Sequence, residues 1–118
     1  MATESEVKKM VKEFLKKELN LVPLGTDPHK ALEQGAKGFW WMPVPSGYGV
    51  SYLDFIGHYR GFFFGIETKK DPTKKPTPKQ QQAIDLTDLT AAAAFLVRSE
   101  EDLNELRDWR RVIDILLF

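Results

Sequence analysis

The chain has 118 residues, of which 42% are hydrophobic and 29% are charged, as is typical of a globular protein with one core. Its 17 basic and 17 acidic residues cancel, so any anion-binding surface must be a local patch. The lack of cysteine excludes disulfides and zinc–thiolate sites and fits a reducing compartment. There is no run of 18 apolar residues, and residues 1–6 do not resemble a signal peptide. We expect a single cytoplasmic domain over residues 1–118 with no membrane association.

The first predicted element is an amphipathic helix near the N-terminus. Thr3 or Ser5 can cap it, and the apolar residues that follow recur at helical spacing: Val7, Met10, Val11, Phe14, Leu15 and Leu19. Residues 21–37 then contain prolines and glycines that interrupt any long element. They predict a loop with one short helical turn around residues 30–34.

A hairpin with Arg60–Gly61 as its two-residue turn is the most informative predicted feature. Residues 39–42 form a short apolar strand before it, and residues 46–49 form a connecting turn. Glycine supplies one of the positive φ angles that such hairpin turns need, whereas positive φ is costly at Arg60. The register predicted from this turn places Tyr59 opposite Phe62, Gly57 opposite Phe64 and Asp54 opposite Glu67. A slip of one residue would move Asp54 to the other face of the sheet.

The predicted register brings two carboxylates together. Directly opposed side chains have Cβ atoms about 4.5–5.5 Å apart, and like charges at that distance destabilise the strand pair. Asp54 and Glu67 therefore suggest a cation between them, and hard carboxylate oxygens suit Mg²⁺. Lys69 lies two residues beyond Glu67 and so points to the same face. The pattern predicts a hydrolytic metal site; the alternative is a solvated surface cluster in which Lys69 neutralises the two acids.

The C-terminal half predicts a loop, a helix, a strand and a last helix. Residues 71–78 are rich in proline and lysine, residues 78–90 form a helix, and residues 93–97 form a short buried strand. Ser99 can cap the last helix, whose apolar face contains Leu103, Leu106, Trp109, Val112, Ile113 and Leu116. The predicted fold is α/β: a mixed four-stranded sheet flanked by helices, with the order αβββαβ followed by a final helix.

The aromatic residues are expected in the core. Phe39, Trp40, Trp41, Phe62, Phe63 and Phe64 fit buried strands better than platforms for base stacking. Trp109 and the apolar tail of residues 113–118 are expected to cover the sheet. Any surplus apolar face could form a dimer interface.

Five segments, taken in order, carry a resemblance to a known family: Met42-Pro-Val, Gly47-Tyr-Gly, Asp54, Gly65-Ile-Glu-Thr-Lys69 and Lys75-Pro-Thr-Pro-Lys-Gln80. Together they look like the VRR-NUC branch of the PD-(D/E)xK nuclease superfamily, and especially like the small stand-alone nucleases of bacteriophages. The resemblance runs from Glu4 to about Ser99. It implies a restriction-endonuclease-like αβββαβ core and Mg²⁺- or Mn²⁺-dependent cleavage of DNA phosphodiesters. For a phage-encoded chain, the host cytoplasm would be its location.

The resemblance also implies roles for single residues. The metal-binding acids of the family fall on Asp54 and Glu67, and its lysine falls on Lys69. A catalytic glutamine on the helix after a basic loop falls on Gln80, and a glutamate on the first helix falls on Glu4, with Glu6 as the alternative. Gln80 has an equally good structural explanation, because Thr77-Pro-Lys-Gln80 is a capping box.

Three features depart from the family pattern. The Gly-Val-Pro-Asp sequence that usually precedes the metal ligand is Ser51-Tyr-Leu-Asp54 here, and the usual Asn-Gly turn is Arg60–Gly61. The segment 25–38 is longer than the usual connection. The first departure bears on the local backbone shape more than on the chemistry, and the segment 25–38 is assigned no inherited role.

Lysines gather on and beside the predicted basic loop. Lys70, Lys74, Lys75 and Lys79, which we call the loop lysines, lie next to Lys69 and are candidates for DNA phosphate contacts. Lys37, Arg60, Tyr48 and Ser51 are weaker candidates. The resulting hypothesis is a metal-dependent DNA endonuclease that acts as a homodimer on branched DNA such as Holliday junctions. The alternatives are a non-catalytic DNA-binding module on the same fold and a protein-interaction domain that uses the last helix.

Overall fold

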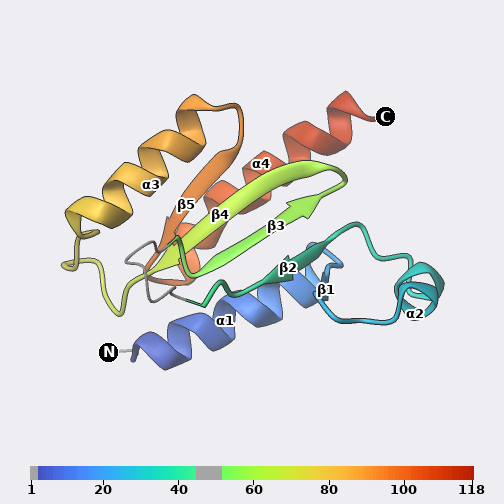
Figure 1. The fold of residues 1–118 in the computed structure, drawn as a ribbon, viewed down its shortest axis with the longest axis horizontal. Coiled ribbons are helices and arrows are strands. Elements are labelled where there is room, and N and C mark those ends of the chain that lie inside the picture. Colours follow the sequence, from blue (N-terminus) through green and yellow to red (C-terminus); the bar gives the residue numbers. More distant parts are fainter. Residues whose placement is uncertain (1–2, 45–51) are drawn as a thin grey trace.

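A five-stranded mixed sheet forms the centre of the fold (Figure 1). The computed structural model describes residues 3–44 and 52–118, so the turn expected at 46–49, with Tyr48 and Ser51, lies outside the described residues. The strands are β1 (Val22–Pro23), β2 (Phe39–Trp41), β3 (Phe55–Tyr59), β4 (Phe62–Thr68) and β5 (Ala93–Val97), in that spatial order. The helices are α1 (Glu4–Lys17), α2 (Pro28–Glu33), α3 (Pro78–Leu89) and α4 (Leu103–Leu116), with a 3₁₀ turn at Glu100–Asp102.

The predicted helices are confirmed, with small changes at their ends. Thr3 caps α1, because its side chain accepts a hydrogen bond from the backbone N–H of Glu6. The apolar stripe of α1 is buried, as its spacing predicts. Ser99 precedes the 3₁₀ turn and makes no capping hydrogen bond through its side chain. No described helix is both long enough and apolar enough to cross a membrane.

The core lies on one face of the sheet, between the strands and the helices α1 and α4. Its buried residues come from both helices and from alternate positions of β3, β4 and β5, including Phe55, Tyr59, Phe64, Phe95 and Leu106. Helix α3 packs against β4 and β5. The hydroxyl of Tyr52, which lies near Gly65 on the opposite face, hydrogen-bonds to Thr87 of α3, so α3 lies on that outer face. In Figure 1, α4 and α1 run behind the strands.

The expected hairpin register is confirmed. The β3–β4 ladder pairs Tyr59 with Phe62, Gly57 with Phe64 and Phe55 with Ile66. Both turn residues have positive φ, 51° at Arg60 and 90° at Gly61. The unfavourable backbone at Arg60 is held by a hydrogen bond from its N–H to the carbonyl of Lys37 and by an ion pair of its side chain with Asp114, at 3.0 Å.

The expectation of four strands was wrong, because part of the predicted loop at 21–37 pairs as β1. Val22 and Pro23 run parallel to Phe39 and Trp40. The backbone N–H of Val22 donates to the carbonyl of Gly38 at 3.2 Å, and that of Leu24 donates to Trp40 at 2.8 Å. Proline is tolerated there because β1 is an edge strand. The short helix expected within this loop is confirmed as α2.

The expected burial of the aromatic residues is only partly correct. Phe64 is buried, and Trp40 packs against the core. Phe62 and Phe63 were expected in the core but are 38% and 39% exposed. Two neighbours in a strand point to opposite faces, so Phe63 points away from the core that Phe64 enters, and Phe62 lies beside the hairpin turn at the start of β4.

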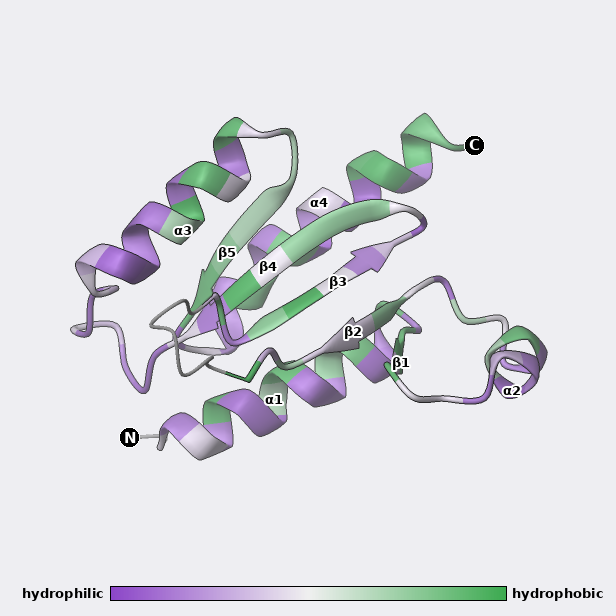
Figure 2. Cartoon of the chain, in the orientation of Figure 1, coloured by the Kyte–Doolittle hydropathy of each residue, from purple (hydrophilic) through white to green (hydrophobic). Residues whose placement is uncertain are grey.

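The apolar end of the chain also differs from the expectation that it covers the sheet. Residues Val112, Ile115, Leu116, Leu117 and Phe118 are exposed and do not cover the sheet, although Ile113 is buried. Figure 2 shows this last turn of α4 as a hydrophobic end that projects beyond the strands.

Candidate metal centre

Asp54 and Glu67 lie together at the end of the hairpin far from its turn. The β3–β4 ladder ends at the pair Phe55–Ile66; Asp54 directly precedes β3, and Glu67 directly follows Ile66 in β4. A hydrogen bond between the two carboxyl groups contributes to the pKa of each. The two carboxyl groups expected from the turn therefore lie together, although the strand ladder itself ends one pair before them.

Glu67 is buried, which a charged residue in a hairpin seldom is. Its Oε2 atom has no hydrogen-bond partner among the described residues. Burial raises the pKa of Glu67, and the hydrogen bond and negative charge of Asp54 raise it further, to about 9. Glu67 is thus held protonated at neutral pH in the metal-free protein.

Asp54 carries the negative charge of the pair. Burial raises its pKa, but hydrogen bonds from Glu67 and Thr68, together with the charge of Lys8, bring the pKa below its usual value. The backbone N–H and the hydroxyl of Thr68 both donate to Asp54 Oδ2, at 3.0 and 2.6 Å. Its Oδ1 atom lies 4.0 Å from Lys8 Nζ. Asp54 is therefore fixed in orientation and remains ionised.

Helix α1 brings two charged residues toward this pair. Glu4 is exposed in the first turn of α1, and its charge contributes to the raised pKa of Glu67. Lys8 lies one turn later, four residues from Glu4, which places both on one side of the helix. Glu6, the alternative to Glu4, instead accepts a hydrogen bond from the Thr3 hydroxyl at 3.2 Å. Sequence reasoning missed Lys8; its spacing from Glu4 was the available signal.

Lys69 follows directly after β4. Its backbone N–H donates to the carbonyl of Val97 at 3.1 Å, so the end of β5 fixes the chain at this point. The Lys69 side chain is half-buried, and its charge lowers the pKa of Glu67, opposing the larger effects that raise it. Lys69 therefore lies within electrostatic reach of the carboxyl pair.

Gln80 takes part in the capping box of α3. Its Oε1 atom accepts from the Thr77 backbone N–H at 2.8 Å, and its own N–H donates to the Thr77 hydroxyl at 3.2 Å. This contact occupies the side-chain oxygen of Gln80 and accounts for the residue without a catalytic role. The role that the family resemblance implies for Gln80 stays a prediction.

The loop lysines project from an anchored loop. Asp71 is buried and accepts hydrogen bonds from the hydroxyl and the backbone N–H of Thr73, which lower its pKa. Arg98 donates to the carbonyl of Pro72 at 3.3 Å. The loop lysines are all exposed. Within residues 3–44 and 52–118, neither they nor Lys69 form an ion pair with a carboxylate. Their charges are available to an anionic partner.

The carboxyl pair fits a hard divalent cation with few protein ligands. In the part of the chain that the structure describes, no group of three or more His, Cys, Asp or Glu side chains could hold a metal. Mg²⁺ commonly uses one or two carboxylates and completes its shell with water and substrate phosphate oxygens. Asp54 and Glu67 supply that number, and the unpartnered Oε2 of Glu67 is a buried acceptor without a donor.

Comparisons of the chain with protein-family models, with curated proteins and with solved structures found no match.

Proposed function

We propose that the chain is a Mg²⁺- or Mn²⁺-dependent endonuclease that hydrolyses DNA phosphodiester bonds at Asp54 and Glu67. The observation that carries the proposal is the buried Glu67 carboxyl, which faces Asp54 and leaves one oxygen without a partner. A protein gains no stability from such a pair alone, because the burial of an unsatisfied carboxyl is costly. A cation that binds both carboxylates would remove the cost and explain the arrangement.

The element order supports the same proposal. Leaving aside β1 and α2, the order α1–β2–β3–β4–α3–β5 matches the αβββαβ order of a restriction-endonuclease-like core. The family resemblance assigns its acid–acid–lysine set to Asp54, Glu67 and Lys69. These residues lie at one end of the β3–β4 hairpin, beside the start of α1.

Each residue then has a role that its surroundings allow. A bound Mg²⁺ would polarise the phosphate and make water a better nucleophile. Thr68 orients Asp54 through two hydrogen bonds, so one carboxylate oxygen of Asp54 remains for the cation. Lys69 would position the attacking water or stabilise the negative charge that develops on the phosphate. Lys8, at 4.0 Å from Asp54, would balance the charge of the pair before substrate binds.

The proposed substrate is DNA because the neighbouring charges suit a polyanion. The loop lysines lie on the connection that leads directly from Lys69 into α3 and, for Lys79, in the first turn of α3, so they can contact phosphates near the scissile bond. Such contacts give affinity without sequence preference. A preference for branched DNA and action as a homodimer follow only from the family resemblance and remain part of the proposal.

The test is incubation of the purified chain with labelled duplex, single-stranded and four-way-junction DNA in Mg²⁺, Mn²⁺ or EDTA. We expect cleavage with either metal and none in EDTA. The Glu67→Gln and Asp54→Asn variants are matched controls, since each keeps the side-chain size and removes a carboxyl group that would bind the metal. DNA binding without cleavage of any substrate would favour the non-catalytic DNA-binding module, and the lack of both would refute the proposal.

A further inference from the structure

Aromatic side chains line the uncovered part of the outer face of the sheet. Phe39 and Trp41 alternate with the core-facing Trp40, and His58 and Phe63 are paired with each other across the β3–β4 ladder. All four are at least partly exposed, and none of them is in the core cluster. We call Phe39, Trp41, His58 and Phe63 the aromatic strip. Exposed aromatic residues that gather on one sheet face require an explanation other than packing.

The strip is ordered by its own contacts. The rings of Phe39 and Trp41 are stacked with centroids 5.8 Å apart and 27° between their planes. His58 meets Phe39 edge-on, with centroids 4.8 Å apart. These contacts hold flat surfaces in place, so the cost in side-chain entropy is small when a ligand stacks on them.

The strip leads toward the candidate metal centre. Trp41 pairs with Ile56 of β3, and Asp54 lies two residues before Ile56, just outside the strand. Two residues along a strand span about 7 Å and return to the same face. Trp41 is therefore the member of the strip nearest to the end of the hairpin that carries the carboxyl pair, and the alternation along β4 puts Glu67 on the same face as Phe63.

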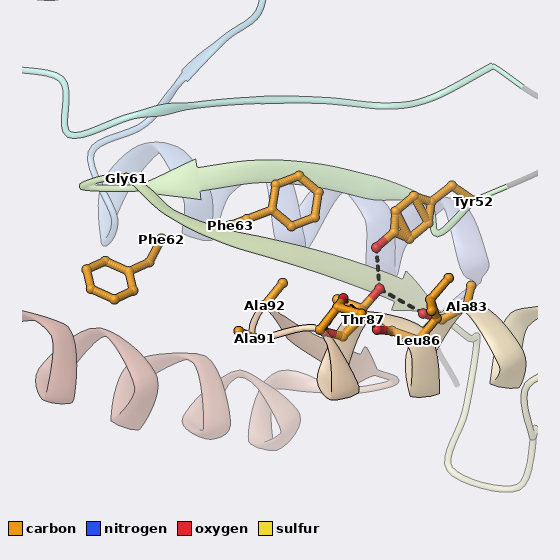
Figure 3. A pocket seen from close by; sticks show the side chains of 10 residues that line it. Tyr52, Gly61, Phe62, Phe63, Ala83, Leu86, Thr87, Ala91 and Ala92 are labelled. Carbon is orange, nitrogen blue, oxygen red and sulfur yellow. Dashed lines mark hydrogen bonds between the residues drawn. The ribbon is translucent and has the colours of Figure 1, made fainter.

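A hollow of about 650 Å³ adjoins the strip between the hairpin and α3 (Figure 3). Its lining includes Phe62 and Phe63 of β4 and Ala83 and Leu86 of α3. The hydroxyl of Thr87 donates to the carbonyl of Ala83 at 2.7 Å, and that of Tyr52 bonds to Thr87. These polar groups already have partners, so the hollow offers contact surface rather than free hydrogen-bond donors.

We propose that the aromatic strip and this hollow bind the unpaired bases of a single nucleic-acid strand whose backbone enters the metal centre. The inference rests on the proposed function for the identity of the site. Flat aromatic rings suit nucleobases, and the lysines at the metal end of the strip suit the phosphates that link them. Stacking on rings requires exposed base faces, which a duplex keeps covered. The strip therefore selects unpaired DNA, whereas the loop lysines bind any DNA.

The experiment measures binding in EDTA, so that it does not depend on cleavage. A single-stranded oligonucleotide that contains 2-aminopurine is titrated with the wild-type chain, and the change in its fluorescence reports stacking. An abasic strand of equal length has the same phosphates without bases, and its affinity is measured by competition. We expect the wild-type chain to bind the base-containing strand at least about tenfold more tightly than the abasic strand.

The variants separate stacking from folding and from charge. Trp41→Ala and Phe63→Leu should each weaken binding of the base-containing strand about tenfold and leave the abasic strand unaffected. Trp41→Phe keeps an aromatic ring and should recover most of the affinity, and Phe63→Leu keeps most of the side-chain volume. Phe118→Ala is the control, because Phe118 is fully exposed at the end of α4, outside the strip.

The outcomes distinguish this inference from the proposed function. Equal affinity for the base-containing and abasic strands, or unchanged affinity in both Trp41→Ala and Phe63→Leu, would overturn the inference even if the chain cleaves DNA in Mg²⁺. Stacking that depends on the strip would support the inference even if no metal produces cleavage. In that case only the nuclease proposal would fail.

Discussion

Replacement of Glu67 by glutamine should stabilise the metal-free protein, and the gain should grow with pH. The pKa of Glu67 is raised from 4.5 to about 9 in the folded chain. Below pH 4.5 the Glu67 carboxyl is protonated in both the folded and the unfolded chain, so this group takes nothing from the free energy of unfolding there. Between pH 4.5 and about 9 only the folded chain holds it, and the free energy of unfolding falls as pH rises.

The size of the effect follows from the same two pKa values. Neutral pH lies about 2.5 units above the pKa of the unfolded carboxyl, and each unit corresponds to about 1.4 kcal/mol. The wild-type fold is therefore less stable at pH 7 than at pH 4 by up to about 3 kcal/mol from this group alone. Glutamine does not titrate, and its amide N–H can still donate to Asp54. The variant should melt up to about 10 °C higher than the wild type at pH 7.

The assay is thermal unfolding of both proteins in EDTA at pH 5, 7 and 8.5, repeated in Mg²⁺. The difference between variant and wild type isolates Glu67, because all other titrating groups are shared. In Mg²⁺ only the wild type should gain stability, and more at pH 8.5 than at pH 5, since metal binding must displace the Glu67 proton. A difference in melting temperature that does not change with pH would refute the buried, protonated state of Glu67.

Three further predictions concern the other candidate site residues. Asp54→Asn should abolish metal-dependent cleavage in a chain that remains folded by circular dichroism; undiminished cleavage would remove Asp54 from the site. Lys69→Ala should cut turnover with little change in DNA affinity, whereas replacement of all loop lysines by alanine should weaken binding and flatten its salt dependence, by up to about one unit of slope for each phosphate that the variant no longer neutralises. Equal effects of the two changes on binding and turnover would show that these roles are not separate. Gln80→Glu keeps the acceptor for the Thr77 N–H and adds a favourable charge in the first turn of α3, so melting and cleavage should both remain near wild type. Cleavage at least about tenfold slower, a difference of about 1.4 kcal/mol in activation free energy, would instead give Gln80 the catalytic role that the family resemblance implies.

Local signals in the sequence predicted most of the fold. The register of the hairpin follows from the turn at Arg60–Gly61, because the distance from a two-residue turn alone decides which residues pair. That distance was enough to bring the side chains of Asp54 and Glu67 together. The capping box at Thr77 and Gln80 is likewise local, and it formed as its spacing predicts.

Features that depend on tertiary packing could not be predicted. β1 has only two residues, one of them proline, and it exists because β2 offers it an edge. The burial of Glu67 depends on elements packed around the end of the hairpin, and the approach of Lys8 to Asp54 depends on how α1 docks under the sheet. Phe63 is exposed because α3 covers only part of the outer face of the sheet. No pattern within β4 indicates which part α3 covers.

The two-residue turn also limits how this chain can change during evolution. Asp54 lies six residues before Arg60, and Glu67 lies six residues after Gly61. The equal lengths of these two segments bring the carboxyl groups to the same level of the hairpin. An insertion or deletion of one residue anywhere between them would shift the pairing of one strand and separate the carboxylates. The segment with α2, by contrast, projects from the sheet and can gain or lose residues without moving the pair. Homologous chains should therefore vary in length before β2 and keep the span from Asp54 to Glu67 constant.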